Sequence, residues 1–137
     1  MKFIATIIAI AALALPAAAQ PPAQAPRVPA FTHALTNVPG KSLIAVEVNY
    51  APGQASPPHR HAKSAFIMAY VVSGAVVSQV EGQPEKTYRA GETWYENPGD
   101  HHVVSRNASA TEPAKMLAVF VVDSDDRTLT TIDPRPN

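Results

Sequence analysis

From residue 31 onward, short apolar segments are separated by glycine and proline, and this pattern most constrains what the chain can fold into. Each segment has the length of one strand, and none shows helical periodicity with capping residues. The turns between them are marked by Gly74, Gly82, Gly91 and the Pro98-Gly99 pair. The pattern predicts an all-β sandwich or barrel with strands at residues 43–50, 65–72, 75–80, 86–89, 93–96, 102–105, 116–123 and 127–132.

The segment 65–72 is almost entirely apolar, which predicts a strand buried on both faces. Five large side chains from this segment and from 93–96 are expected to belong to the core first, and to line a ligand cavity only second. They are Phe66, Met68, Tyr70, Trp94 and Tyr95.

Residues 1–19 have the pattern of a cleaved signal peptide. Lys2 precedes an apolar run over residues 3–15, and Ala17 and Ala19 are the small residues that signal peptidase selects before Gln20. The run is shorter than the roughly twenty apolar residues of a membrane-spanning helix. The chain has no cysteine, so neither a lipoprotein signal nor a disulfide framework exists. We predict export to the periplasm of a bacterium, or secretion.

Residues 20–30 are rich in proline and alanine and are predicted to be a flexible leader, which leaves residues 31–137 as one domain. Eleven basic and eleven acidic side chains are scattered along the chain. This distribution provides no electrostatic footprint for nucleic acid or, after cleavage, for a membrane surface. A small-molecule ligand is the expected partner, and a homodimer through an edge strand is compatible with the pattern.

Two histidines with one residue between them, His59 and His61, follow a Pro-Pro pair, and His102 follows the turn at Pro98-Gly99. On an extended backbone, side chains two residues apart project to the same side. A third imidazole from another strand can then complete a three-nitrogen face for a divalent transition metal. Imidazole ligands suit Fe, Ni, Cu and Zn, so the pattern does not identify the metal.

The spacings Gly53-x5-His59-x-His61 and Gly91-x7-Gly99-x2-His102 resemble the two motifs of the cupin superfamily, over about residues 40–123. Asn97 stands where the second motif usually has its proline, which is displaced to Pro98. The resemblance implies a double-stranded β-helix, or jelly-roll, barrel. It also implies that His59, His61 and His102 bind one metal inside the barrel. Because cupins also use Mn, this ion joins Fe, Ni, Cu and Zn as a candidate.

One departure from the family pattern concerns the fourth ligand. The first motif normally has a glutamate three or four residues after its second histidine, but Ala65 and Phe66 occupy those positions. Measured from the other end of the motif, seven residues before Gly74, the glutamate position is occupied by Ile67. No acidic residue lies between His61 and Val80. The site therefore has either three histidines and water or a carboxylate from elsewhere. Glu96 is the best candidate for that carboxylate, as a fourth ligand or as a catalytic proton-transfer group.

Three further polar residues are expected to lie outside the site. His101 is adjacent to His102 and must point the opposite way on a strand, and Arg60 must point away from its two histidine neighbours. His33 lies in the entry segment and is expected on the surface.

Three functions are compatible with these residues. The first is a metal-dependent enzyme, most plausibly a dioxygenase of the quercetin-dioxygenase-like type and otherwise an isomerase, acting on a small organic molecule. The second is a cupin that binds a metal and a small molecule without turnover, and the third is a degenerate cupin without metal. The absent glutamate favours the second and third, whereas the three intact histidines argue against the third. Nothing in the sequence names the substrate, because one fold and one ligand set serve many chemistries.

Overall fold

The structure is a computed structural model that describes residues 27–134. All regular secondary structure in that range is β-strand. None of the described residues forms a helix that is long and apolar enough to cross a membrane. The predicted signal peptide, residues 1–19, and residues 20–26 of the predicted leader lie outside the described residues. The strands are β1 (Pro29–Ala34), β2 (Lys41–Tyr50), β3 (Ala55–Ser56), β4 (His59–His61), β5 (Phe66–Ser73), β6 (Ala75–Val80), β7 (Lys86–Arg89), β8 (Thr93–Glu96), β9 (His101–Asn107), β10 (Ala114–Asp123) and β11 (Thr130–Ile132).

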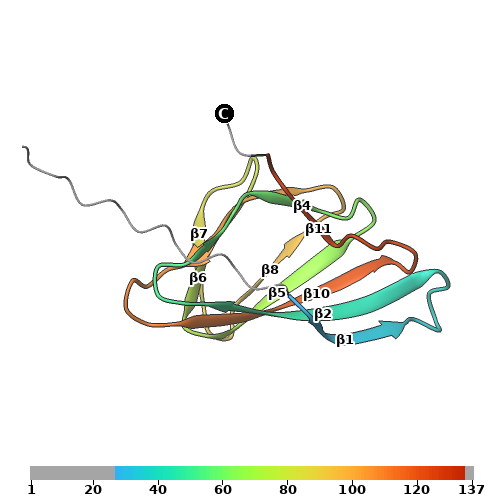
Figure 1. The fold of residues 1–137 in the computed structure, drawn as a ribbon, viewed down its shortest axis with the longest axis horizontal. Coiled ribbons are helices and arrows are strands. Elements are labelled where there is room, and N and C mark those ends of the chain that lie inside the picture. Colours follow the sequence, from blue (N-terminus) through green and yellow to red (C-terminus); the bar gives the residue numbers. More distant parts are fainter. Residues whose placement is uncertain (1–26, 135–137) are drawn as a thin grey trace, which may run out of the picture.

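The strands form two antiparallel sheets that face each other as the two walls of a barrel (Figure 1). The first sheet has the order β1-β2-β10-β5-β8, and the second has the order β11-β4-β9-β6-β7, with β3 paired to β9. Strands that are adjacent in these sheets are mostly distant in sequence, as in a jelly roll. The predicted double-stranded β-helix is thus confirmed.

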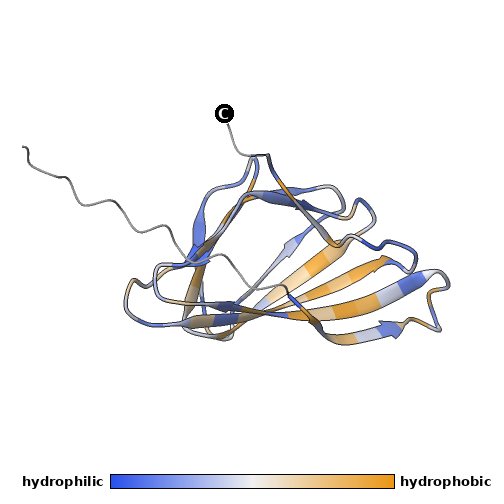
Figure 2. Cartoon of the chain, in the orientation of Figure 1, coloured by the Kyte–Doolittle hydropathy of each residue, from blue (hydrophilic) through white to orange (hydrophobic). Residues whose placement is uncertain are grey.

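The inward faces of the two sheets differ in polarity, so the interior of the barrel has one apolar side and one polar side. Figure 2 shows the apolar residues concentrated on β2, β5 and β10 of the five-stranded sheet. The inward side chains of these strands form most of the core, with Phe120, Met116 and Ile67 among the largest. The six-stranded sheet instead buries several polar side chains, namely His59, Ser78, His102, Ser105 and Asn107.

Strands β6, β7 and β8 have the bounds predicted from the sequence, whereas β1, β3 and β4 were not predicted as strands. Two of these three have only two or three residues, too few for a visible alternation of polarity. Strand β1 begins at Pro29, inside the segment predicted to be an unpaired leader, and pairs with β2. It forms an edge of its sheet, where the first residue can be a proline because no ladder hydrogen bond is lost.

The prediction that segment 65–72 is buried on both faces is wrong. Exposure alternates along β5, so that Ile67, Ala69 and Val71 are buried while the intervening side chains face outward. No described element covers this outer face of the five-stranded sheet. Of the five large residues predicted as core, only Trp94 is buried, and the others are exposed, namely Phe66, Met68, Tyr70 and Tyr95.

Gly74 connects β5 of one sheet to β6 of the other in a single residue, with φ at +71°. A Cβ at this position would lie 2.6 Å from the carbonyl oxygen of Pro113 and 2.9 Å from the Cα of Ala114. Both the backbone conformation and the contact with the start of β10 therefore require glycine. Gly82 has a similar φ of +80°, but nothing lies within 4 Å of a Cβ there.

These two glycines provide a matched test of the crossing between the sheets. Both Gly74→Ala and Gly82→Ala incur the cost of a left-handed backbone, roughly 1–2 kcal/mol. Only Gly74→Ala adds the steric conflict with β10, for which a further cost of about 1–3 kcal/mol is typical of overpacking. Urea unfolding should therefore show the larger loss of stability for Gly74→Ala. Equal losses in the two variants would contradict the tight crossing.

Candidate metal centre

Three histidines converge on one point of the barrel interior. His59 and His61 lie on β4, and His102 lies on β9 directly opposite His59 in the antiparallel register. The ring centroids of His59 and His61 are 4.8 Å apart, and those of His59 and His102 are 5.0 Å apart. One nitrogen from each ring lies within 4.8 Å of the others, so the three predicted ligands are brought together.

The second nitrogen of each ring is held by an oxygen outside the cluster. His59 Nδ1 donates to the carbonyl oxygen of Pro57 at 2.7 Å, and His61 Nδ1 lies 3.1 Å from both the carbonyl oxygen of Leu129 and Thr130 Oγ1. His102 Nε2 lies 2.9 Å from Ser78 Oγ. These partners leave Nε2 of His59, Nε2 of His61 and Nδ1 of His102 for the cluster. Partners of this kind orient metal-binding imidazoles in proteins.

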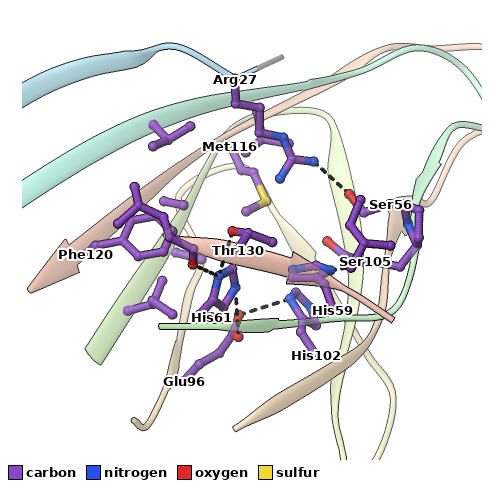
Figure 3. A pocket seen from close by; sticks show the side chains of 18 of the residues that line it. Arg27, Ser56, His59, His61, Glu96, His102, Ser105, Met116, Phe120 and Thr130 are labelled. Atoms are coloured by element: carbon purple, nitrogen blue, oxygen red, sulfur yellow. Dashed lines mark hydrogen bonds and ion pairs between the residues drawn. The ribbon is translucent and has the colours of Figure 1, made fainter. Parts of the chain in front are cut away.

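Glu96 is buried on β8, at 2 % exposure, and its carboxylate faces two of the three histidines (Figure 3). Glu96 Oε1 lies 3.1 Å from His102 Nδ1, and Glu96 Oε2 lies 3.5 Å from His61 Nε2. Trp94 Nε1 donates a long hydrogen bond of 3.4 Å to Oε1. The sequence does not show whether Glu96 faces the same side as His102, because the Pro98-Gly99 turn lies between the two residues. The strand pairing brings it into the cluster.

The register of β5 and β8 explains why Glu96 lies beside the histidines. Ile67, the residue reached by counting back from Gly74, pairs directly with Glu96 across β5 and β8. Both side chains are buried and line the same cavity. A carboxylate thus faces the cluster from the strand next to β5, at the level of Ile67.

The cluster lies in a cavity of about 490 Å³ between the two walls of the barrel. Its apolar wall comes from β2, β5 and β10, and its polar wall from β4 and β9 and from the segment that contains Leu129 and Thr130. A cavity with an apolar lining and a few convergent polar groups is typical of small-molecule sites.

Burial changes the proton affinity of every ionisable group in the cluster. Desolvation lowers the pKa of His59, and desolvation together with the neighbouring His59 lowers the pKa of His61 to about 4 and that of His102 to about 3. Desolvation raises the pKa of Glu96 to about 7. The imidazoles are therefore neutral at neutral pH, which is the form that binds metals.

The donor set fits a divalent transition metal. Within the described residues, Glu96 Oε2 is a buried oxygen without a hydrogen-bond partner, although buried carboxylates normally have one. A cation held by the three imidazoles would be next to this oxygen and would compensate its charge. Three nitrogens and one oxygen are a common ligand set for such ions.

The other polar residues singled out in the sequence lie outside the cluster. His101 points away from His102, with Nε2 2.7 Å from Asp133 Oδ2 and Nδ1 3.4 Å from Glu81. Arg60 is exposed and pairs with Glu81 at 3.6 Å, and His33 is exposed on β1.

Sequence reasoning missed several residues that line the cavity or hold the histidines. Ser78 could have been found, because it shares the inward face of β6 with Val76 and Val80, where a polar side chain is unusual. No sequence signal marked Pro57, Leu129 or Thr130. Pro57 and Leu129 act through their backbone carbonyls, and the contacts of Leu129 and Thr130 with His61 form only on folding. Arg27 lines the cavity although it lies in the predicted leader.

Residues 46–120 match the family described as cupin domain, more than half of the chain. The chain belongs to the cupin family. No curated protein matches the sequence significantly.

Solved structures with the same fold include enzymes and a protein of unassigned function. The DMSP lyase DddQ from Ruegeria pomeroyi DSS-3 has 22% identity and a TM-score of 0.55 over 66% of this chain and 42% of its own. An oxalate oxidase has 26% identity and a TM-score of 0.54 over 68% and 46%. An uncharacterized double-stranded β-helix protein from Klebsiella pneumoniae has 16% identity and a TM-score of 0.57 over 80% and 84%. This cupin therefore spans less than half the length of the lyase and the oxidase.

The shifted pKa values predict that the metal-free cupin loses stability in mild acid. Below pH 6.5 the unfolded chain protonates the three histidines, whereas the folded chain keeps His61 and His102 neutral to about pH 4 and 3. The unfolded state then binds more protons, so the free energy of unfolding falls as pH falls, by about 1.4 kcal/mol per pH unit for each of His61 and His102. Glu96 acts in the opposite direction between about pH 7 and 4.5, because its proton is held more tightly in the folded state. The two histidines outweigh the one carboxyl, and His59, whose pKa is also lowered, adds to the loss of stability.

Urea unfolding between pH 5 and 7.5 in the presence of a chelator measures this slope. His61→Asn should make the dependence shallower by about 1.4 kcal/mol per pH unit, and the exposed control His33→Asn should leave it unchanged. Equal stability of the wild-type domain at pH 5 and 7 would contradict the burial of neutral imidazoles.

Proposed function

We propose that this cupin is a metal-dependent enzyme that acts on a small organic molecule within the barrel. The observation that carries the proposal is the convergence of His59, His61, His102 and Glu96 in one cavity. A purely structural cluster would not need a carboxylate oxygen without a hydrogen-bond partner next to two of the three imidazoles, because burying such a group without compensation is costly.

The residues of the chain would divide the work as follows. The three histidines would hold the metal, with Glu96 as fourth ligand or beside it, and Fe, Mn, Ni, Cu and Zn all fit these donors. When bound, such a metal would supply Lewis-acid or redox chemistry to a ligand in the cavity. Val48, Met116 and Phe120 would exclude water from the bound molecule.

Glu96 is suited to move a proton if it is not fully committed to the metal. In the metal-free site, desolvation raises its pKa to about 7, so this carboxyl holds a proton more readily than an exposed carboxyl does. Its carboxylate lies 3.5 Å from His61 Nε2 and 3.1 Å from His102 Nδ1, beside the position where the histidines would hold the metal. Glu96 is therefore our candidate catalytic residue.

Among reaction classes, we favour an oxygen-dependent reaction of the quercetin-dioxygenase-like type, with isomerisation as the second choice. The family resemblance of the two histidine motifs supports this choice. The likeness to a protein whose name is oxalate oxidase is a weaker support, because it covers less than half of that protein.

Two further parts of the proposal concern where and in what state the protein works. The signal pattern at Lys2, the apolar run and Ala17 to Ala19 supports export to the periplasm or outside the cell. The homodimer, compatible with the sequence pattern, stays a prediction.

Metal analysis tests the first step of the proposal. Purified protein should contain about one divalent ion per chain, and His59→Ala, His61→Ala and His102→Ala should each lose it, because each removes one ligand. His33→Ala and His101→Ala should keep it, since both side chains lie outside the cluster. A metal content in the ligand variants equal to that of wild type would refute the site, and its absence from wild type would favour a degenerate cupin.

Glu96→Gln separates a functional carboxylate from a structural one. It should weaken metal affinity by about 10–100-fold if Glu96 supports the metal, or abolish turnover with the metal in place if Glu96 transfers a proton. Glu92→Gln is the control, because Glu92 is exposed on the turn before β8. Metal titration and oxygen consumption with a panel of phenols, flavonols and thiols are the measurements. If both variants behave like wild type, Glu96 has no role in metal binding or turnover. If no compound consumes oxygen while metal is bound, the oxygen-dependent reaction is refuted for these compounds, and isomerisation or binding without turnover remains.

A further inference from the structure

The outer face of the five-stranded sheet is apolar where a face open to water is expected to be polar. In an antiparallel sheet with one buried face, the side chains of the other face are normally polar. On β5, the exposed large residues of this face are Phe66, Met68, Tyr70 and Val72. On the adjacent β10, the outward residues between the charged ends of the strand are Leu117, Val119 and Val121. The middle of this face therefore has the composition of a core.

The strand register connects these positions into a continuous row. Residues that pair directly across antiparallel strands lie on the same face of the sheet. Phe31 on β1 pairs with Ala45 on β2, and Ala45 pairs with Val119 on β10. Val119 also pairs with Met68 on β5, and Met68 pairs with Tyr95 on β8. The apolar row therefore crosses all five strands of the sheet.

Six large residues form the exposed part of this surface, and each exposes 36–59 % of its area to solvent. This outer apolar face consists of Phe31, Phe66, Met68, Tyr70, Val72 and Tyr95. Because a whole aromatic side chain has about 150–250 Å² of surface, the six residues together expose on the order of 500 Å². Two copies of the face, with the half-buried residues around them on β2 and β10, would bury about 1,200 Å², which is the lower limit for a stable protein interface.

The charges around the outer apolar face favour a second copy of the chain over other partners. The outward charged residues on the strands of this sheet are two lysines and two acids, which pair with each other. Lys41 Nζ lies 2.6 Å from Asp123 Oδ1, and Lys115 Nζ lies 3.2 Å from Glu47 Oε2. An identical copy would therefore meet no uncompensated charge of its own sign. An anionic membrane would instead select a surface with an excess of basic residues.

We propose that the outer apolar face is the contact surface of a homodimer with two-fold symmetry, in which two five-stranded sheets pack face to face. Sheets pack in this way in β-sandwiches, about 10 Å apart. A two-fold contact uses the same residues of both chains, and the neutral apolar row meets this requirement. Aromatic residues and methionine are also the types that are enriched in protein interfaces. The cavity lies on the other side of this sheet, so the inference goes beyond the proposed function and does not depend on the metal.

The mass of the protein in solution tests the dimer. Sedimentation equilibrium on the mature chain should give twice the mass of one chain at about 100 µM, with dissociation on dilution toward about 1 µM, because the interface is of modest area. Urea unfolding provides a second readout. The midpoint of unfolding should rise with protein concentration, because association stabilises only the folded chains.

Met68→Lys places a charge in the row itself, and Tyr70→Lys places one beside it. Each substitution enters a two-fold interface twice, so each should weaken dimerisation by about 100-fold or more. Both residues are exposed in the single chain, so the circular dichroism spectrum and the metal content should remain those of wild type. Val38→Lys is the matched control and should dimerise like wild type. Val38 is a similarly exposed apolar residue, but it lies between β1 and β2, outside the outer apolar face.

A wild-type protein that stays monomeric at about 100 µM would overturn the inference, and co-sedimentation of this monomer with phosphatidylglycerol vesicles would assign the face to a membrane. A dimer that persists in both Met68→Lys and Tyr70→Lys would also overturn it, and would favour the edge-strand contact that the sequence pattern allows. If a lysine variant does not fold, Met68→Ser or Tyr70→Ser takes its place and should weaken dimerisation by about tenfold or more. An unchanged dimer in these serine variants would count against the face in the same way.

Discussion

The antiparallel pairing of β4 with β9 is the interaction on which the interior of this barrel depends. It sets His59 directly opposite His102, and the period of two along β4 then brings His61 to the same side. Because β9 also pairs with β6, the same register places Ser78 within hydrogen-bond distance of His102. A slip of one residue would turn these side chains to the outside and leave the cavity without its nitrogen donors.

This polar wall has an energetic cost. Three imidazoles and a carboxylate are buried together, and desolvation opposes the charged form of each of them. The cost is limited by backbone carbonyls and hydroxyl groups that occupy the outer imidazole nitrogens. What remains uncompensated is Glu96 Oε2, on the side where the histidines present their free nitrogens. Groups that are expensive to bury and are kept together in a cavity point to function rather than to stability.

Several elements could be predicted from the sequence because their signal is local. Strands β6, β7 and β8 are bounded by glycine or proline turns, and the histidine spacing of His59 and His61 needs only an extended backbone. The outer face of β5 could not be predicted. A run such as Phe66 to Val72 has the same composition whether one face is covered or both, and only the arrangement of the sheets decides this. Likewise, β1 was hidden because a proline-rich segment gains strand structure only by pairing with β2.

The sequence by itself therefore determined the all-β class, the turns, the three histidines of the cluster and the absence of the motif glutamate, because each depends on residue type and spacing along the chain. The tertiary structure alone decided which carboxylate faces the histidines and what else lines the cavity. Glu96 reaches the cluster because β8 pairs with β5 opposite Ile67, and Arg27 reaches the cavity because β1 docks the preceding chain onto the edge of the sheet. Both depend on contacts between strands distant in sequence, which a barrel creates only when it closes.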